Sequence, residues 1–196
     1  MFDTLGAQNW AVSNDILSAQ FCEDLARECQ LLNAEGRFQK AAIGFGQSKT
    51  NASDIRGDST FWLDTNAISP AQRMANVCLA DFLGHLNQSF FLGLKRFEAH
   101  FAHYPPGTGY EKHVDNHLGA NSRKITFIIY LNKQWQEGHG GELSLYSSHD
   151  ENILLKKIEP RIGTMVLFRS ELFPHQVEKS LQPRLSLTGW FRDDAL

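Results

Sequence analysis

Hydrophobic residues recur at helical spacing in the first half of the chain. The first such set is Phe21, Leu25, Cys29 and Leu32. Apolar side chains three or four residues apart lie on one face of a helix. Ser18, just before the set, is a residue type that caps the first turn, and Gly36 is one that ends a helix. The pattern therefore predicts one amphipathic helix between about 18 and 36.

A second helix is predicted to begin after Ser69. Ser69 can cap it, Pro70 suits its first turn, and Gln72 can complete a capping box. Its predicted apolar face consists of Met74, Val77, Cys78, Leu83 and Leu86. We expect this face to pack against a sheet.

From residue 97 onward the pattern becomes that of strands. Residues 97–104 alternate between apolar and polar types, and 125–131 form the continuous apolar run of a buried strand. Further short strands are predicted near 143–145, 153–158, 163–169, 173–178 and 184–192. Many short strands after two helices favour an α+β fold that is mainly β: a double-stranded β-helix, or jelly roll, buttressed by N-terminal helices.

The length of 196 residues favours a single domain. We expect helical support over about 1–96 and a jelly-roll core over about 97–192. Between the predicted helices, residues 42–58 are rich in glycine and small polar residues. This composition predicts a long loop, which is either a lid or a solvated connector.

Composition narrows the partners and the compartment. A net charge of −3 gives no global attraction to phosphate backbones or anionic membranes, so neither nucleic acid nor membrane is expected as a partner. The first residues show no basic segment followed by an apolar run, and no stretch approaches a membrane span, which favours a cytoplasmic location. The cysteines Cys22, Cys29 and Cys78 are expected to be buried, reduced thiols.

Three polar residues in the second half can form an iron site. A non-haem Fe(II) centre that activates O2 needs two imidazoles and one carboxylate on one face. His113 and Asp115 are two residues apart, so on a strand their side chains point the same way, while Val114 faces the core. His175 would complete the set from a distant strand. The H-x-D motif is common by chance, so the prediction depends on the order and context of all three residues.

Arg184 begins the last apolar strand and predicts a co-substrate. Alternation places Arg184, Ser186 and Thr188 on one face, where a guanidinium beside hydroxyls can bind a carboxylate bidentately. Together with an Fe(II) site, this anchor indicates 2-oxoglutarate and O2 as co-substrates. The chemistry indicated by the residues is that of an oxygenase.

The segment YPPGTGYEKHVDN at 104–116 resembles the prolyl hydroxylases that modify hypoxia-inducible factor. Further motifs follow in that family's order: DIRGD at 54–58 with Trp62, YLNK at 130–133 with Trp135, GGEL at 140–143, IEP at 158–160, Pro174-His175 and Trp190. The resemblance spans roughly residues 40–192. It implies a 2-oxoglutarate/Fe(II) prolyl 4-hydroxylase that produces hydroxyproline, succinate and CO2, with ascorbate as the reductant.

The resemblance also implies roles for individual residues. It makes His113, Asp115 and His175 the iron ligands, and it makes Arg184 the partner of the distal carboxylate of 2-oxoglutarate. The residues matching positions around that co-substrate are Tyr104, Tyr130 and Thr188. Those matching positions around the substrate are Arg56, Asp58, Tyr110, Arg123 and Trp190. The implied partner is a protein with a target proline, in the translation machinery or in a regulatory protein.

Other interpretations stay open from the residues alone. Tyr130 and Trp190 could be core aromatics, Arg56 and Asp58 could pair only to shape a turn, and His100 is expected at the surface or the edge of the core. The same oxygenase chemistry could act on a free amino acid, a small metabolite or an alkylated base. A non-catalytic jelly-roll binding module is the alternative from another class, and it should need no Fe(II).

Overall fold

The computed structural model describes residues 1–41, 55–64, 66, 69–116 and 122–194. Most of the predicted loop at 42–58 therefore lies outside the described residues. The helices are α1 (Phe2–Gln8), α2 (Ala19–Ala34) and α3 (Pro70–Phe90). The strands are β1 (Trp10–Ser13), β2 (Gln39–Lys40), β3 (Ser59–Trp62), β4 (Arg96–Tyr104), β5 (Tyr110–His113), β6 (Arg123–Tyr130), β7 (Leu143–Tyr146), β8 (Leu154–Ile158), β9 (Met165–Arg169), β10 (His175–Val177) and β11 (Arg184–Arg192).

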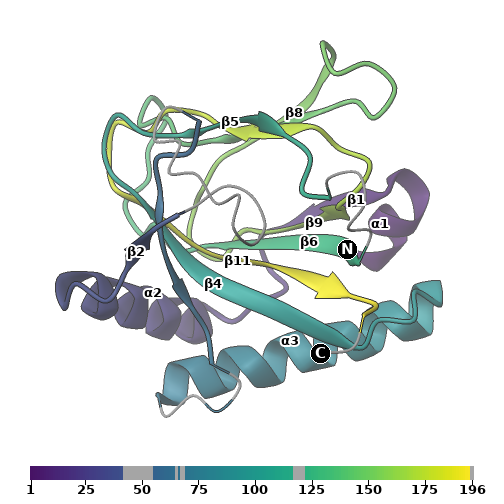
Figure 1. The fold of residues 1–196 in the computed structure, drawn as a ribbon, viewed down its shortest axis with the longest axis horizontal. Helices are drawn as coiled ribbons and strands as arrows, with labels where there is room; N and C mark the ends of the chain where they lie inside the picture. The colour runs from purple at the N-terminus through teal and green to yellow at the C-terminus, as the bar shows by residue number, and fades with distance from the viewer. Residues whose placement is uncertain (42–54, 65, 67–68, 117–121, 195–196) are drawn as a thin grey trace, which may run out of the picture.

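The strands form two antiparallel sheets that face each other (Figure 1). The larger sheet has the order β1-β9-β6-β11-β4-β3-β2, and the smaller has the order β5-β10-β7-β8. Helices α2 and α3 cover the outer face of the larger sheet, away from the smaller one (Figure 1). The predicted double-stranded β-helix with helical support is confirmed.

Two apolar cores hold these layers together. One lies between the helices and the larger sheet, where Leu25, Leu79 and Phe127 are buried. The other lies between the two sheets and includes Leu145 and Phe168. Because the second core fills only part of the space between the sheets, polar side chains can converge beside it.

Both predicted helices start where the sequence indicates. The side chain of Ser18 accepts a hydrogen bond from the N–H of Phe21 at 3.3 Å, and Ser69 does the same for Gln72 at 3.5 Å. The side chain of Gln72, however, donates to Glu28 on α2 at 2.7 Å instead of completing a capping box.

The predicted apolar face of α3 is wrong in part. Met74 is 47% exposed and Val77 is 63% exposed, while Leu86 is buried as expected. The buried residues of α3 are Gln72, Ala75, Leu79, Phe82 and Leu86. The helix is thus rotated relative to the prediction, so that part of its apolar surface faces outward.

Of the three cysteines, Cys22 and Cys29 are buried, and Cys78 is half-buried. Burial raises the pKa of the Cys22 thiol to about 11. The thiol therefore keeps its proton and is expected to be unreactive. None of the helices in the described part of the chain is both long and apolar enough to cross a membrane.

Candidate active site

The three predicted metal ligands meet between the two sheets. His113 ends β5 and pairs in register with His175, the first residue of β10. The Nε2 atom of His113 lies 3.6 Å from Oδ1 of Asp115, and Nε2 of His175 lies 3.7 Å from Oδ2 of the same carboxylate. One donor atom from each residue falls within 4.8 Å of the others, as a shared metal ion requires.

The prediction that strand alternation brings Asp115 to the site beside His113 is wrong. Strand β5 ends at His113, so Asp115 reaches the site through a bend and not by strand alternation. Val114 is accordingly half-buried and not part of the core. The H-x-D spacing works here because the chain turns directly after the first ligand.

Hydrogen bonds orient all three ligands. Nδ1 of His113 lies 2.7 Å from the carbonyl of Glu111, and Nδ1 of His175 lies 3.0 Å from the carbonyl of Phe173. Because a carbonyl only accepts, each Nδ1 carries the proton and each Nε2 presents a lone pair to the site. Thr126 donates to Asp115 Oδ2 at 2.7 Å. Two neutral imidazoles and one carboxylate fit Fe(II).

The electrostatics keep the ligands in the forms that bind a metal. Burial would raise the pKa of Asp115, but His175 and His113 outweigh it and hold this pKa below its ordinary value. Burial and the neighbouring His113 lower the pKa of His175 to about 4. At neutral pH the site therefore presents a carboxylate and an unprotonated His175.

Arg184 lies in the wall of the same cavity and is 2% exposed. Its Nε atom donates to the carbonyl of Gly141 at 2.8 Å, and its guanidinium stacks 4.9 Å from the ring centre of Tyr104 and 5.1 Å from that of Tyr130. None of the described carboxylates forms an ion pair with it. A buried cation without a counter-ion is costly, so this arrangement calls for an anionic ligand.

The hydroxyl of Tyr130 supports this interpretation. It is buried and has no hydrogen-bond partner among the described residues. Burial raises the pKa of Tyr130, so the phenol keeps its proton and can donate it to a bound oxygen. Tyr130 and Arg184 together fit a carboxylate such as the far end of 2-oxoglutarate.

The predicted polar face of the last strand is confirmed. Nη1 of Arg184 lies 3.5 Å from the hydroxyl of Ser186, which lies 3.1 Å from that of Thr188. Trp190 continues the same face and lines the cavity together with Arg184 and Thr188. One strand, β11, therefore supplies the anion anchor at one end and an aromatic wall at the other.

Trp190 lines the cavity, and Arg123 packs against its ring. The guanidinium of Arg123 lies 3.6 Å from the centre of the Trp190 ring and is held by hydrogen bonds to Glu98. Trp190 is buried, and its Nε1 has no acceptor in the described part of the chain. This indole offers both a flat apolar face and a hydrogen-bond donor.

Arg56 and Tyr110 also line the cavity, and Asp58 pairs with Arg56. Arg56 donates two hydrogen bonds to the buried carboxylate of Asp58, at 2.6 and 2.9 Å. Its guanidinium lies 4.8 Å from the Tyr110 ring centre, and that ring stacks 3.6 Å from the ring of His113. The pairing of Arg56 with Asp58 does more than shape a turn, because it also holds Tyr110 against a metal ligand.

Sequence reasoning missed His100. This residue was expected at the surface or core edge, but it is 1% exposed and lines the same cavity. Its ring centre lies 4.6 Å from that of Trp62 and 5.6 Å from that of Trp190, and its Nδ1 has no described partner. His100 and Tyr104 are four residues apart on β4 and so share a face, but the pairing of β4 with β11 decides that this face lines the cavity.

Comparisons with known proteins agree with this geometry. The profile of the 2OG-Fe(II) oxygenase superfamily matches residues 99–192. The solved structure of a Pseudomonas putida prolyl-4-hydroxylase is 34% identical, with a TM-score of 0.86 over 98% of this chain and 97% of that one. The chain belongs to the 2OG-Fe(II) oxygenase superfamily.

Two further known proteins are similar to this chain. Human Egl nine homolog 1 is 29% identical over 190 residues, which cover 93% of this chain and 43% of that protein. The chain thus spans about half the length of the curated relatives that it matches first. A Trichoplax adhaerens prolyl hydroxylase, solved with a peptide of the hypoxia-inducible factor oxygen degradation domain, shares the fold at 24% identity, with a TM-score of 0.87 over 98% of this chain and 87% of that one.

Proposed function

We propose that this protein is an Fe(II)- and 2-oxoglutarate-dependent prolyl 4-hydroxylase that acts on a proline of a cytosolic protein. The observation that carries the proposal is a single cavity lined by the His113, Asp115 and His175 triad, by the unpaired cation of Arg184, and by Trp190. A metal site, an anion anchor and an aromatic surface are the three parts that this reaction needs. The prolyl-4-hydroxylase from Pseudomonas putida, similar over nearly its whole length, supports the substrate class.

The triad would hold Fe(II) on one face and leave the opposite positions open. Iron bound there would use O2 to convert 2-oxoglutarate to succinate and CO2 and to oxidise a C–H bond of the substrate. The carbonyls of Glu111 and Phe173 fix the two imidazoles, so that both Nε2 atoms point at the metal. These hydrogen bonds would therefore fix the position at which the iron binds.

Arg184 and Tyr130 would orient 2-oxoglutarate. The guanidinium pairs with the distal carboxylate, while the Tyr130 hydroxyl donates a further hydrogen bond. Because Gly141, Tyr104 and Tyr130 already fix the guanidinium, little side-chain entropy is lost when the co-substrate binds. This anchoring turns the keto-acid end toward the triad.

Residues that line the cavity would hold the target peptide. The prolyl ring lies against the face of Trp190, whose position is fixed by Arg123 and His100. Arg56 and Tyr110, which line the same cavity, would contact the peptide as well. We propose a partner in the translation machinery or a regulatory protein, in which the proline lies in an exposed segment that can enter this cavity.

The test measures succinate and hydroxyproline together. Purified protein is supplied with Fe(II), 2-oxoglutarate and ascorbate, with and without host-cell lysate protein, either intact or proteolysed. We expect succinate formation coupled to a gain of one oxygen atom on a prolyl residue, located by mass spectrometry as 4-hydroxyproline. Succinate without prolyl oxidation would keep the oxygenase and refute the prolyl substrate, and the absence of succinate under all conditions would favour a binding module.

Two variants test the metal site and the anion anchor separately. Asp115→Ala should abolish turnover because the metal loses its carboxylate ligand, and full turnover in this variant would refute the ligand assignment. Arg184→Ala should mainly raise the KM for 2-oxoglutarate, by about a hundredfold if one charge-assisted pair of about 3 kcal/mol is lost. Arg27→Ala is the matched control, because its side chain is 71% exposed and pairs only with Asp24 among the described residues.

A further inference from the structure

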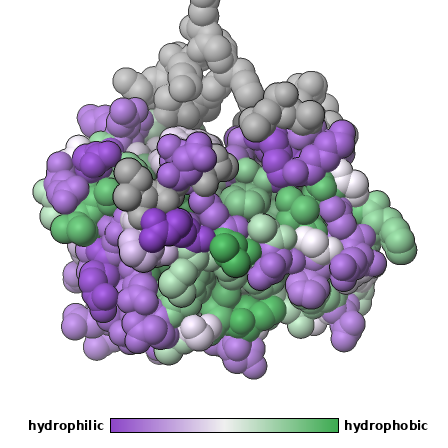
Figure 2. Space-filling model, turned by 90° about the horizontal axis from the view of Figure 1, so that it is seen from below, coloured by the Kyte–Doolittle hydropathy of each residue, from purple (hydrophilic) through white to green (hydrophobic). Residues whose placement is uncertain are grey.

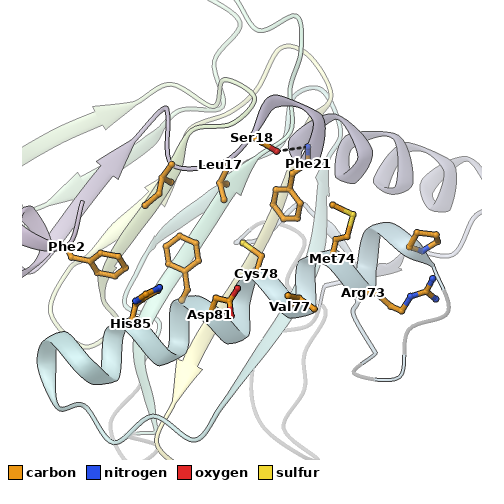
Figure 3. A pocket seen from close by; sticks show the side chains of 13 residues that line it. Phe2, Leu17, Ser18, Phe21, Arg73, Met74, Val77, Cys78, Asp81 and His85 are labelled. Carbon is orange, nitrogen blue, oxygen red and sulfur yellow. Dashed lines mark hydrogen bonds between the residues drawn. The ribbon is translucent and has the colours of Figure 1, made fainter.

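The outer surface of α3 carries an apolar groove that the proposed reaction does not use. The groove encloses about 920 Å³ between α3 on one side and α1 with the start of α2 on the other (Figure 3). Phe2 of α1, Leu17 just before α2 and Phe21 of α2 line one side, and Met74 and Val77 line it from α3. Figure 2, which looks onto the helical side of the molecule, shows apolar side chains exposed among the polar ones.

The charges on α3 are arranged symmetrically about the most exposed apolar residue in this groove. Val77 is 63% exposed, Arg73 lies four residues before it, and Asp81 lies four residues after it. Each charge is therefore about 6 Å from Val77 along the helix axis, at a rise of about 1.5 Å per residue. Both charged residues are exposed and border the groove.

We propose that this face binds a second copy of the chain, with the two α3 helices antiparallel about a two-fold axis that passes beside Val77. In that arrangement Val77 meets Val77 of the other copy. Arg73 meets Asp81 of the other copy, and Asp81 meets its Arg73. The interface is self-complementary, as a closed dimer with two-fold symmetry requires.

The sizes of the side chains fit the same pairing. Two-fold symmetry about Val77 places Met74 opposite Ala80, and it places Pro70 opposite Gly84. Large exposed side chains thus meet small ones, which lets the two helices approach closely. A Cβ atom added at Gly84 would meet no atom within 4 Å, so open space lies over that position.

The charged residues can serve such a contact. Asp81 forms no hydrogen bond or ion pair with another residue that the structure describes. Arg73 carries five N–H donors, enough to bind an intermolecular carboxylate in addition to its contacts within the chain. A foreign amphipathic helix would also fill the groove, but it would not account for charges placed symmetrically about Val77.

The proposed dimer leaves the active site open. Helix α3 packs on the face of the larger sheet opposite to the cavity that holds the metal ligands (Figure 1). The interface therefore needs no residue of that cavity. Dimer formation and turnover can be measured separately, so the outcome for one does not decide the other.

Charge reversal tests the pairing. The molar mass of wild type, Asp81→Arg, Arg73→Asp and the double variant is measured by sedimentation equilibrium over a concentration series. We expect a wild-type dimer that each single reversal weakens about tenfold or more, because two ion pairs become two repulsions, and that the double reversal restores. Asp150→Arg, an exposed change on the β7–β8 hairpin, is the control for net charge and should leave the dimer intact.

A monomeric wild type at every concentration would overturn the proposal. So would a dimer that both single reversals leave unchanged, because a contact elsewhere would then hold the copies together. A second variant, Val77→Glu, places two carboxylates at the axis and should also give a monomer. Succinate formation and the far-UV circular dichroism of each variant should match the wild type, which excludes misfolding as the cause.

Discussion

Replacing His100 with phenylalanine should remove part of the pH dependence of stability. His100 is 1% exposed, and burial together with the charge of Arg56 lowers its pKa to about 3 from the ordinary 6.5. The folded protein therefore keeps this imidazole neutral, whereas the unfolded chain protonates it below pH 6.5. The stability involved is fully present above pH 6.5 and is lost as the pH falls from there toward about 3.

The size of this effect follows from the difference between the two pKa values. One pH unit within that window corresponds to about 1.4 kcal/mol per group. At about pH 5, one and a half units below the pKa in the unfolded chain, His100 should lower the free energy of unfolding by about 2 kcal/mol. Phenylalanine keeps a ring beside Trp62 and Trp190 but does not titrate, so the variant should escape this loss.

Urea unfolding followed by tryptophan fluorescence measures the difference. Wild type, His100→Phe and the control His149→Phe, which changes an exposed imidazole, are compared in EDTA at about pH 7.5 and about pH 5. Between these two values wild type should lose about 2 kcal/mol more than His100→Phe, and the control should behave as wild type. An equal loss in wild type and His100→Phe would refute the argument that burial keeps His100 neutral.

Three further changes test particular contacts. Thr126→Val removes the donor to Asp115 Oδ2 and should weaken Fe(II) binding about 10- to 100-fold in a metal titration; unchanged affinity would contradict the orienting role. Gly141→Ala should raise the KM for 2-oxoglutarate, because a Cβ atom at φ +77° would lie 3.1 Å from Cδ of Arg184; an unchanged KM would show that the anchor tolerates displacement. Leu79→Ala should cost about 2–5 kcal/mol in urea unfolding, and less than 1 would show that the core collapses around it.

The sequence predicted the strands better than it predicted the orientation of α3. Strand β11 was predicted at 184–192 and has these bounds, because a polar and apolar alternation defines both its extent and its faces. For α3 the start was right, but the buried face was not. The buried Gln72 bonds to Glu28 of another helix, a contact that no local pattern reveals. Helix α1 and strand β1 were not predicted, because each is short.

The candidate site was predictable where its residues lie in a local pattern. His113, Asp115 and Arg184 were found because spacing or alternation sets them apart. His100 was missed because its place in the cavity depends on the pairing of β4 with β11, where it stands opposite Thr188. Contacts between strands distant in the sequence are fixed by register, which one sequence shows only indirectly.

Strand β11 lies in the middle of the larger sheet, hydrogen-bonded to β4 on one side and β6 on the other. Its residues Arg184 and Trp190 are six apart, which places their Cα atoms about 20 Å apart along the strand at about 3.3 Å per residue. A slip by one residue would turn both side chains away from the cavity. The register with two neighbouring strands therefore fixes the anion anchor relative to the aromatic wall, so neither side chain can shift along the sheet without the other.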